Sequence, residues 1–178
     1  GYAELILEEP EIDHAEFAGR IQKSGKRLSR TLQAVLDMAQ LESGTFRIDD
    51  GDVSIEPLIY DIVEEHRARA ADKGVEIHVK TTGVASLHTD RTLLRRSVSN
   101  LLHNAVKFTE TGRVDVNVTS ADSGVRITIA DTGIGIDPEF QPHLFDPFKQ
   151  ESEGRTRTHE GTGLGLALTK RMVDLLGG

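Results

Sequence analysis

The spacing of apolar residues changes near residue 44 and divides the chain into two parts. Between residues 2 and 41, apolar positions recur at intervals of three, four and seven, which is typical of a helix with one buried stripe. Glu8-Glu9-Pro10 interrupts the pattern, and Asp13 with Glu16 predicts a capping box that begins a second helix. We therefore predict a helical hairpin over residues 1–44. The stripe of its second helix comprises Phe17, Ile21, Leu28, Leu32, Val35 and Ala39.

This apolar stripe has nothing within a lone hairpin to bury against. Two such hairpins packed together would form a four-helix bundle, so we predict a homodimer. The opposite helix face carries basic residues, which we interpret as a solvated surface: Arg20, Lys23, Arg27 and Arg30.

Short strands and helices alternate over residues 45–178, the second predicted domain. Residues 45–48 and 52–55 are predicted strands, and Pro57 begins a helix that Gly74 ends. Apolar and polar residues alternate over 75–80, which predicts a half-buried strand.

The pattern of the remaining residues completes an α/β arrangement. Asp90 is predicted to cap a long helix that ends near Phe108, and valines and isoleucines alternate over 114–118 and 125–129. A final helix is predicted over 164–176. Helices that share one sheet with hairpin-paired strands indicate an α+β domain, specifically a two-layer α/β sandwich.

The composition excludes several classes of function. The 178 residues contain 21 Lys plus Arg against 29 Asp plus Glu, and the net charge of −8 disfavours binding to nucleic acid or anionic lipid. The absence of cysteine excludes disulfides, thiolate zinc sites and a cysteine nucleophile. No run approaches the roughly 20 apolar residues of a membrane span, so we expect no membrane insertion. A phosphorylated ligand would have to be bound by a few local groups.

One face of the long predicted helix carries polar residues suited to such a ligand. Asn100, Asn104 and Lys107 lie at i, i+4 and i+7, so they share a narrow face. Two amide oxygens and an ammonium group suit a divalent cation with phosphate oxygens around it. An ordinary polar face is the alternative. The core stripe is predicted on another side, at Leu94, Val98, Leu101, Ala105 and Phe108.

A second candidate segment follows the strand at 125–129. Asp131 shares the face of its aliphatic residues, so we expect its carboxylate to point inward and to need a partner. A purine amino group is a natural donor to it. The sequence continues as Asp131-Thr-Gly-Ile-Gly-Ile136, in which Gly133 and Gly135 permit close approach of a ligand. A structural turn with a locally bonded aspartate is the alternative.

A third segment, Gly161-Thr-Gly-Leu-Gly-Leu166, directly precedes the last predicted helix. Glycines at a helix N-terminus leave N–H groups that can receive an anion. The Rossmann and Walker patterns do not fit, because no strand leads directly into the glycines and no Gly-Lys-Ser/Thr follows. Residues 150–160 contain no aliphatic side chain, and we predict that they form a mobile lid.

In this order the segments resemble the motifs of the sensor histidine kinase catalytic core, of the Bergerat-fold or GHKL class. The hairpin resembles the family's dimerisation and phosphoacceptor hairpin. The four motifs are the N box, Asn100-Leu-Leu-His-Asn104-Ala-Val-Lys107-Phe108-Thr109; the G1 box, Asp131-Thr-Gly-Ile-Gly-Ile136; the F box, Phe145-Asp-Pro-Phe148; and the G2 box, Gly161-Thr-Gly-Leu-Gly-Leu166.

The resemblance implies ATP as the substrate nucleotide and Mg²⁺ as its cation. Asn104 would ligate Mg²⁺, with Asn100 and Lys107 contacting phosphates or metal-bound water. Asp131 would accept a hydrogen bond from the adenine amino group. The other residues implied in nucleotide binding are Phe108, Gly133, Gly135, Ile136, Phe145, Phe148, Gly161, Thr162, Gly163, Leu164, Gly165 and Leu166. Of these, Gly163 and Gly165 would offer N–H groups to phosphates, and Phe145 and Phe148 would anchor the lid.

The implied reaction is phosphoryl transfer from ATP to a histidine, and from there to an aspartate of a response-regulator receiver domain. Hydrolysing relatives of the gyrase, Hsp90 and MutL types have a glutamate one helical turn before the metal-binding asparagine. Asn100 occupies that position here, and an amide cannot take up a proton, which favours transfer over hydrolysis. The segment would belong to the cytoplasmic portion of its parent protein.

The phosphoacceptor motif, His-Glu-x-x-Thr-Pro, does not occur in the sequence, and none of the seven histidines replaces it. We expect the acceptor histidine upstream of Gly1 and the family's closing strands after Gly178. Two alternatives stay open: a nucleotide-sensing or scaffold module without transfer activity, and an ATPase of the same fold.

Overall fold

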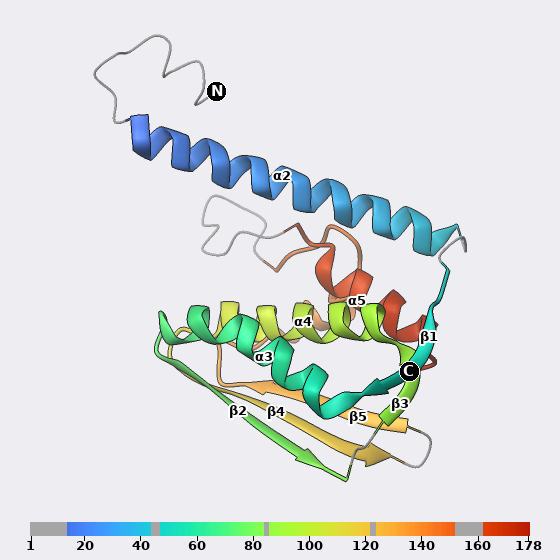
Figure 1. Ribbon diagram of the computed structural model, residues 1–178. Coiled ribbons are helices and arrows are strands. Elements are labelled where there is room, and N and C mark those ends of the chain that lie inside the picture. Colours follow the sequence, from blue (N-terminus) through green and yellow to red (C-terminus); the bar gives the residue numbers. More distant parts are fainter. Residues whose placement is uncertain (1–13, 44–46, 84–85, 122–123, 152–161) are drawn as a thin grey trace. The chain divides into compact units, whose positions relative to one another are not determined.

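The computed structural model describes residues 14–43, 47–83, 86–121, 124–151 and 162–178 (Figure 1). The chain divides into two compact units, residues 1–44 and residues 45–178. Among the helices in the described ranges, none combines the length and the apolar content of a membrane span.

The first unit contains the helix α2, His14–Glu42. The second helix of the predicted hairpin is therefore confirmed, whereas the first predicted helix and Asp13 of the capping box lie outside the described residues. Members of the predicted stripe are exposed along α2, with Leu28 at 62% and Leu32 at 56%. A helix that leaves large aliphatic side chains in water carries a surface suited to a partner.

The second unit is built on a three-stranded sheet in the order β2-β4-β5. Strand β2, Val75–Thr82, pairs in parallel with β4, Gly112–Ala121, which pairs antiparallel with β5, Gly124–Asp131. A separate two-stranded antiparallel sheet joins β1, Asp50–Ser54, to β3, Ser86–Asp90.

Three helices form the second layer, on one face of the large sheet (Figure 1). They are α3, Ile55–Ala71; α4, Arg91–Phe108; and α5, Gly165–Leu175. A short 3-10 helix, Gln141–His143, lies in the connection between β5 and α5. The long helix α4 contacts both other helices and the sheet. The predicted two-layer α/β sandwich is confirmed.

The core lies between the sheet and the helices. Alternate residues of β4, which are Val114, Val116 and Val118, are buried, as are Leu102 and Val106 of α4. The side chains between them on β4 face the opposite, polar surface of the sheet. Because β4 is buried on one face and not on the other, apolar and polar residues alternate along it, and this alternation could be recognised in the sequence.

Three details of the predicted elements are wrong. Residues 47–49 are irregular, and β1 begins at Asp50, because the short strand takes its bounds from pairing with β3, which its own pattern did not reveal. Strand β3 itself was not predicted. In α4, Leu101 and Phe108 are only half-buried, whereas Leu102 and Val106 are buried. This helix is covered on more than one side, so a single stripe underestimates its buried surface.

Asp90 begins α4, as the sequence predicts. Its Oδ1 atom accepts hydrogen bonds from the N–H groups of Thr92 at 2.8 Å and Leu93 at 2.9 Å, and Oδ2 accepts one from Asp49 at 2.9 Å. Burial disfavours the charged form of Asp90, but these three hydrogen bonds outweigh it and lower the carboxyl pKa below its ordinary 3.8. The ionised side chain thereby fixes the start of the N-box helix.

We expect Asp90→Ala to lower the free energy of unfolding by about 1–3 kcal/mol, because three backbone donors, of which that of Leu93 is buried, lose their acceptor. Because the folded-state pKa is lowered, the contribution of the ionised carboxylate is complete above pH 3.8 and is lost as the pH falls through the folded-state pKa. Urea denaturation as a function of pH measures both effects. Glu110→Ala, at an exposed carboxylate beyond the helix end, is the control. An equal loss in both variants would contradict the capping role.

Candidate functional site

The G1 box packs against the end of the N-box helix at Gly133. A Cβ atom at this position would lie 2.5 Å from the carbonyl oxygen of Phe108, which real Cβ atoms do not approach. The same oxygen accepts a hydrogen bond from the N–H of Ile134 at 3.3 Å. Only glycine permits this approach of one backbone to another.

The F box and the G2 box meet in the same way at Gly163. This residue has φ +70°, and a Cβ atom would lie 2.6 Å from the carbonyl carbon of Phe148. The N–H of Phe148 donates to the carbonyl oxygen of Gly163 at 2.9 Å. Phe148 itself has φ +65°, which is uncommon for a bulky residue. The contact therefore holds the F box in a conformation that costs free energy.

The third meeting joins the N box to the G2 box. A Cβ atom at Gly165 would lie 2.9 Å from Oδ1 of Asn100. The Nδ2 atom of Asn100 donates to the hydroxyl of Thr169 on α5 at 2.7 Å. Asn100 therefore fixes α5 to α4, a contact that the sequence did not predict. The buried Thr169 was missed as well, although a threonine beside Leu168 in an apolar stripe is a sign of a specific polar partner.

Asn104 and Lys107 lie on α4 at half-buried positions. Within the described part of the chain, the Asn104 amide makes no hydrogen bond with another residue, so its oxygen is available to a ligand. The Nζ atom of Lys107 lies 4.4 Å from the centroid of the Phe108 ring. This distance is within the range of a cation–π interaction, which holds the ammonium group near the end of α4.

Asp131 ends β5 on the face predicted for it, opposite the buried Val114. Its carboxylate is nevertheless exposed, so the predicted burial is wrong. The last residue of the strand lies at the rim of the sheet, where solvent reaches it. Oδ1 accepts a hydrogen bond from the N–H of Gly133 at 2.9 Å, so the aspartate is locally bonded within its own turn. The carboxylate still has acceptor capacity for a second donor.

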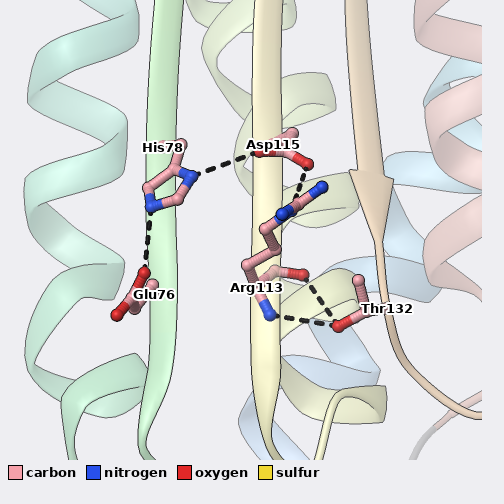
Figure 2. A network of polar contacts seen from close by, with 5 residues as sticks. All are labelled: Glu76, His78, Arg113, Asp115 and Thr132. Atoms are coloured by element: carbon pink, nitrogen blue, oxygen red, sulfur yellow. Dashed lines mark hydrogen bonds and ion pairs between the residues drawn. The ribbon is translucent and has the colours of Figure 1, made fainter.

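Thr132 attaches the G1 box to the neighbouring strand (Figure 2). Its hydroxyl accepts from the N–H of Arg113 at 3.0 Å and donates to the Arg113 carbonyl at 3.3 Å. The Arg113 side chain contacts Asp115 at 3.0 Å, and Asp115 lies 3.4 Å from His78. Exposed ion pairs contribute little to stability, so the backbone bonds at Thr132 carry this attachment.

The G2 box leads into the N-terminus of α5. Leu164 is fully buried, and its N–H donates to the hydroxyl of Thr162 at 3.3 Å. No side chain caps the start of the helix at Gly165. The first N–H groups of a helix without a cap remain available to an anion, in accord with the cradle predicted here.

The remaining predicted residues are less closely connected. Gly135 has φ +74° and open space around it, and Ile136 and Phe145 are exposed, so no contact described here brings these three to the others. Gly161 and most of the predicted lid, which spans residues 150–160, lie outside the described residues.

A surface hollow of about 420 Å³ lies elsewhere, beside β1. Its lining includes Asp49, Asp50, Asp52 and Arg91 but no residue of the four motifs. Across the ranges that the structure describes, no cluster of three or more His, Asp or Glu side chains could hold a metal ion. A cation at the motif residues would therefore need oxygen ligands from elsewhere, as the phosphates of a bound nucleotide provide.

Comparison with known families agrees with this geometry. Residues 89–178 match the family described as histidine kinase-, DNA gyrase B-, and HSP90-like ATPase. The chain belongs to this family. The matched range begins at the end of β3 and includes all four motifs.

Two of its relatives are a sensor kinase/phosphatase and a sensory/regulatory protein. The chain is 36% identical over 163 residues to the autoinducer 2 sensor kinase/phosphatase LuxQ of Vibrio vulnificus, covering 87% of this chain and 19% of LuxQ. It is 35% identical over 178 residues to the sensory/regulatory protein RpfC of Xanthomonas campestris, covering 94% and 24%. The chain thus spans about a fifth to a quarter of these relatives.

A solved structure of full-length ShkA in complex with AMPPNP is also similar, with a TM-score of 0.81 and 32% identity over 93% of this chain and 35% of ShkA. The resemblance recognised in the sequence is confirmed. The chain carries the ATPase domain of this family and is similar, over most of its length, to a part of a sensor kinase.

Gly163 and Gly74 have similar backbone conformations but different surroundings. Gly74 has almost the same backbone, φ +68°, but open space around it. We expect Gly74→Ala to lower the free energy of unfolding by about 1–2 kcal/mol, from the strained φ alone. Gly163→Ala should lower the free energy of unfolding by about 3 kcal/mol or more, because the new Cβ atom also clashes with the backbone of Phe148. Urea denaturation measures both, and equal losses would show that the approach to Phe148 is unimportant.

Proposed function

We propose that this domain transfers the γ-phosphoryl group of ATP to a histidine on a dimerisation helix outside this chain, from which it passes to a response-regulator aspartate. The observation that carries the proposal is the set of close contacts that joins the four motifs: the G1 and G2 boxes each meet α4, and the F box meets the G2 box. At Gly133 and Gly163 a Cβ atom would lie 2.5 Å and 2.6 Å from backbone atoms of Phe108 and Phe148, and at Gly165 it would lie 2.9 Å from Oδ1 of Asn100. Family membership and the sensor-kinase relatives support the same function.

Asn104 is the proposed ligand of Mg²⁺. Its amide oxygen is a hard ligand without a protein partner in the described ranges, and the setting lacks the several carboxylates of a protein-only cation site. Asn104 would therefore hold the cation together with phosphate oxygens. When bound, Mg²⁺ would neutralise charge on the transferred phosphoryl group.

The adenine base and the phosphates of the nucleotide would contact other residues of the four motifs. Asp131 would accept from the adenine amino group, because one of its oxygens remains after the bond to Gly133. The N-terminus of α5 and the ammonium of Lys107 would receive the phosphates.

The proposed transfer needs positioning more than acid or base chemistry. A histidine ring nitrogen forms the new N–P bond while the bond between the γ-phosphorus and the β,γ-bridging oxygen breaks, and ADP leaves with that electron pair. At the position where a water-activating base would be needed for hydrolysis, Asn100 is bonded to Thr169. An amide in this contact takes up no proton, which disfavours hydrolysis.

A homodimer is proposed for the first unit. The exposed aliphatic side chains Ile21, Leu28, Leu32 and Val35 of α2 follow helical spacing. The same surface on a second copy would bury them in a helical bundle.

Measured affinity for Mg-ATP tests the nucleotide site. We expect the chain to bind Mg-ATP, and Asn104→Ala or Asp131→Ala to weaken binding about tenfold or more, because each removes one hydrogen bond or ligand to the nucleotide. Isothermal titration calorimetry measures the affinity. Asn117→Ala, on the outer side of β4, is the matched control and should bind as the unaltered chain does. Full affinity retained in the double variant Asn104→Ala with Asp131→Ala would contradict the proposed site.

Labelling with γ-phosphate-labelled ATP tests the transfer. We expect no phosphohistidine on the 178-residue chain, because none of its seven histidines lies in a His-Glu-x-x-Thr-Pro motif. A chain lengthened upstream to include that motif should become labelled. Phosphohistidine on the chain itself would refute the proposed location of the acceptor, and ATP turnover of about 1 per second or more would favour an ATPase.

A further inference from the structure

The carboxyl end of α4 shows an unusually complete set of hydrogen bonds. An α-helix leaves its last four carbonyl groups without partners in the helix. At this end, the Ala105 carbonyl accepts from the N–H of Thr109 at 3.1 Å and from its hydroxyl at 2.7 Å. The Phe108 carbonyl accepts from Ile134 of the G1 box at 3.3 Å. Two carbonyl groups lie between them.

The side chain of Lys73 is the hydrogen-bond donor to both of these carbonyl groups. Its Nζ atom donates to the carbonyl oxygens of Val106 at 2.7 Å and Lys107 at 2.8 Å. Lys73 lies in the turn between α3 and β2, whose backbone is fixed by Lys73 N–H to Ala70 at 3.0 Å and Gly74 N–H to Ala71 at 2.9 Å. The ammonium is therefore delivered to the helix end by a defined turn from another element.

The charge of Lys73 matters because the end of a helix attracts cations. Unsatisfied carbonyls and the helix dipole place partial negative charge there, and ammonium groups within the last turn are drawn to it. Lys107 is the basic residue in the last turn of α4 itself. The ammonium of Lys107 lies over the Phe108 ring, while that of Lys73 donates hydrogen bonds to the carbonyl groups at the helix end.

We propose that Lys73 is a positioning residue of the nucleotide site, which caps the end of α4 and so keeps the Lys107 ammonium directed to the phosphates. Without Lys73, the Lys107 side chain folds back toward the carbonyls of its own helix, and the end of α4 loses its anchor beside the G1 box. The inference rests on the proposed function, because it acts through the phosphate contact of Lys107.

A double-mutant cycle tests the coupling. Mg-ATP affinity is measured by calorimetry for the 178-residue chain and for Lys73→Met, Lys107→Met and the double variant. We expect each single variant to bind about tenfold more weakly, because Lys107→Met loses its charge-assisted contact with the phosphates and Lys73→Met leaves the Lys107 ammonium directed away from them. The double variant should bind no more weakly than Lys107→Met, because Lys73 acts through Lys107. Losses that multiply to about a hundredfold in the double variant would overturn the inference.

Two further variants separate positioning from general stability. Lys73→Arg keeps donors for both carbonyls and should restore affinity to within about twofold, whereas an affinity equal to that of Lys73→Met would overturn the inference. Lys80→Met, at an exposed lysine of β2, is the matched control and should bind normally. If Lys73→Met is unfolded at the assay temperature, Lys73→Gln takes its place in the cycle with the same expected outcomes.

Failure of this inference differs from failure of the proposed function. If the unaltered chain does not bind Mg-ATP, the proposed phosphate site is overturned and the inference with it. The same holds if the Lys107→Met variant binds Mg-ATP as tightly as the unaltered chain does. Normal binding by the unaltered chain, with a defect in Lys107→Met and none in Lys73→Met, overturns the role of Lys73 alone.

Discussion

The site depends on how closely the backbone around α4 can be approached. The Phe108 carbonyl meets the G1 box at Gly133, where a Cβ atom would lie 2.5 Å from the oxygen, and the Asn100 side chain meets the start of α5 at Gly165, where a Cβ atom would lie 2.9 Å from Oδ1. One helix thereby fixes the loop that follows β5 and the N-terminus of α5. If either approach were lost, the residues of the motifs would remain in the sequence but the segments that carry them would no longer be held against α4.

This constraint explains how an acidic chain can hold a polyanion. A net charge of −8 opposes ATP at long range, so binding must come from groups placed at short range. The candidates are the ammonium of Lys107, the uncapped N–H groups of α5 and a cation held at Asn104. Backbone dipoles and a bound cation add positive charge locally without changing the composition of the protein.

Much of the fold could be predicted because burial is one-sided. The valines of β4 alternate with polar residues along the sequence, and the position of Asp90 directly before an apolar helical pattern predicts the start of α4. Strand β3 was missed because its residues, Ser86–Asp90, are mostly polar and become a strand only by pairing with β1. Asp131 was expected to be buried, since alternation gives the face of a strand but not where the covering layer ends.

The sequence by itself determined the family and the four motifs, because side-chain type, order and spacing are local properties of the chain. Only the tertiary structure decided what the residues touch. The bond from Asn100 to Thr169 joins positions 69 residues apart, and Lys73 reaches carbonyls of Val106 and Lys107 from another turn. Such contacts involve hydrogen bonds to groups whose place follows from the packing of whole elements, and no local pattern encodes that packing.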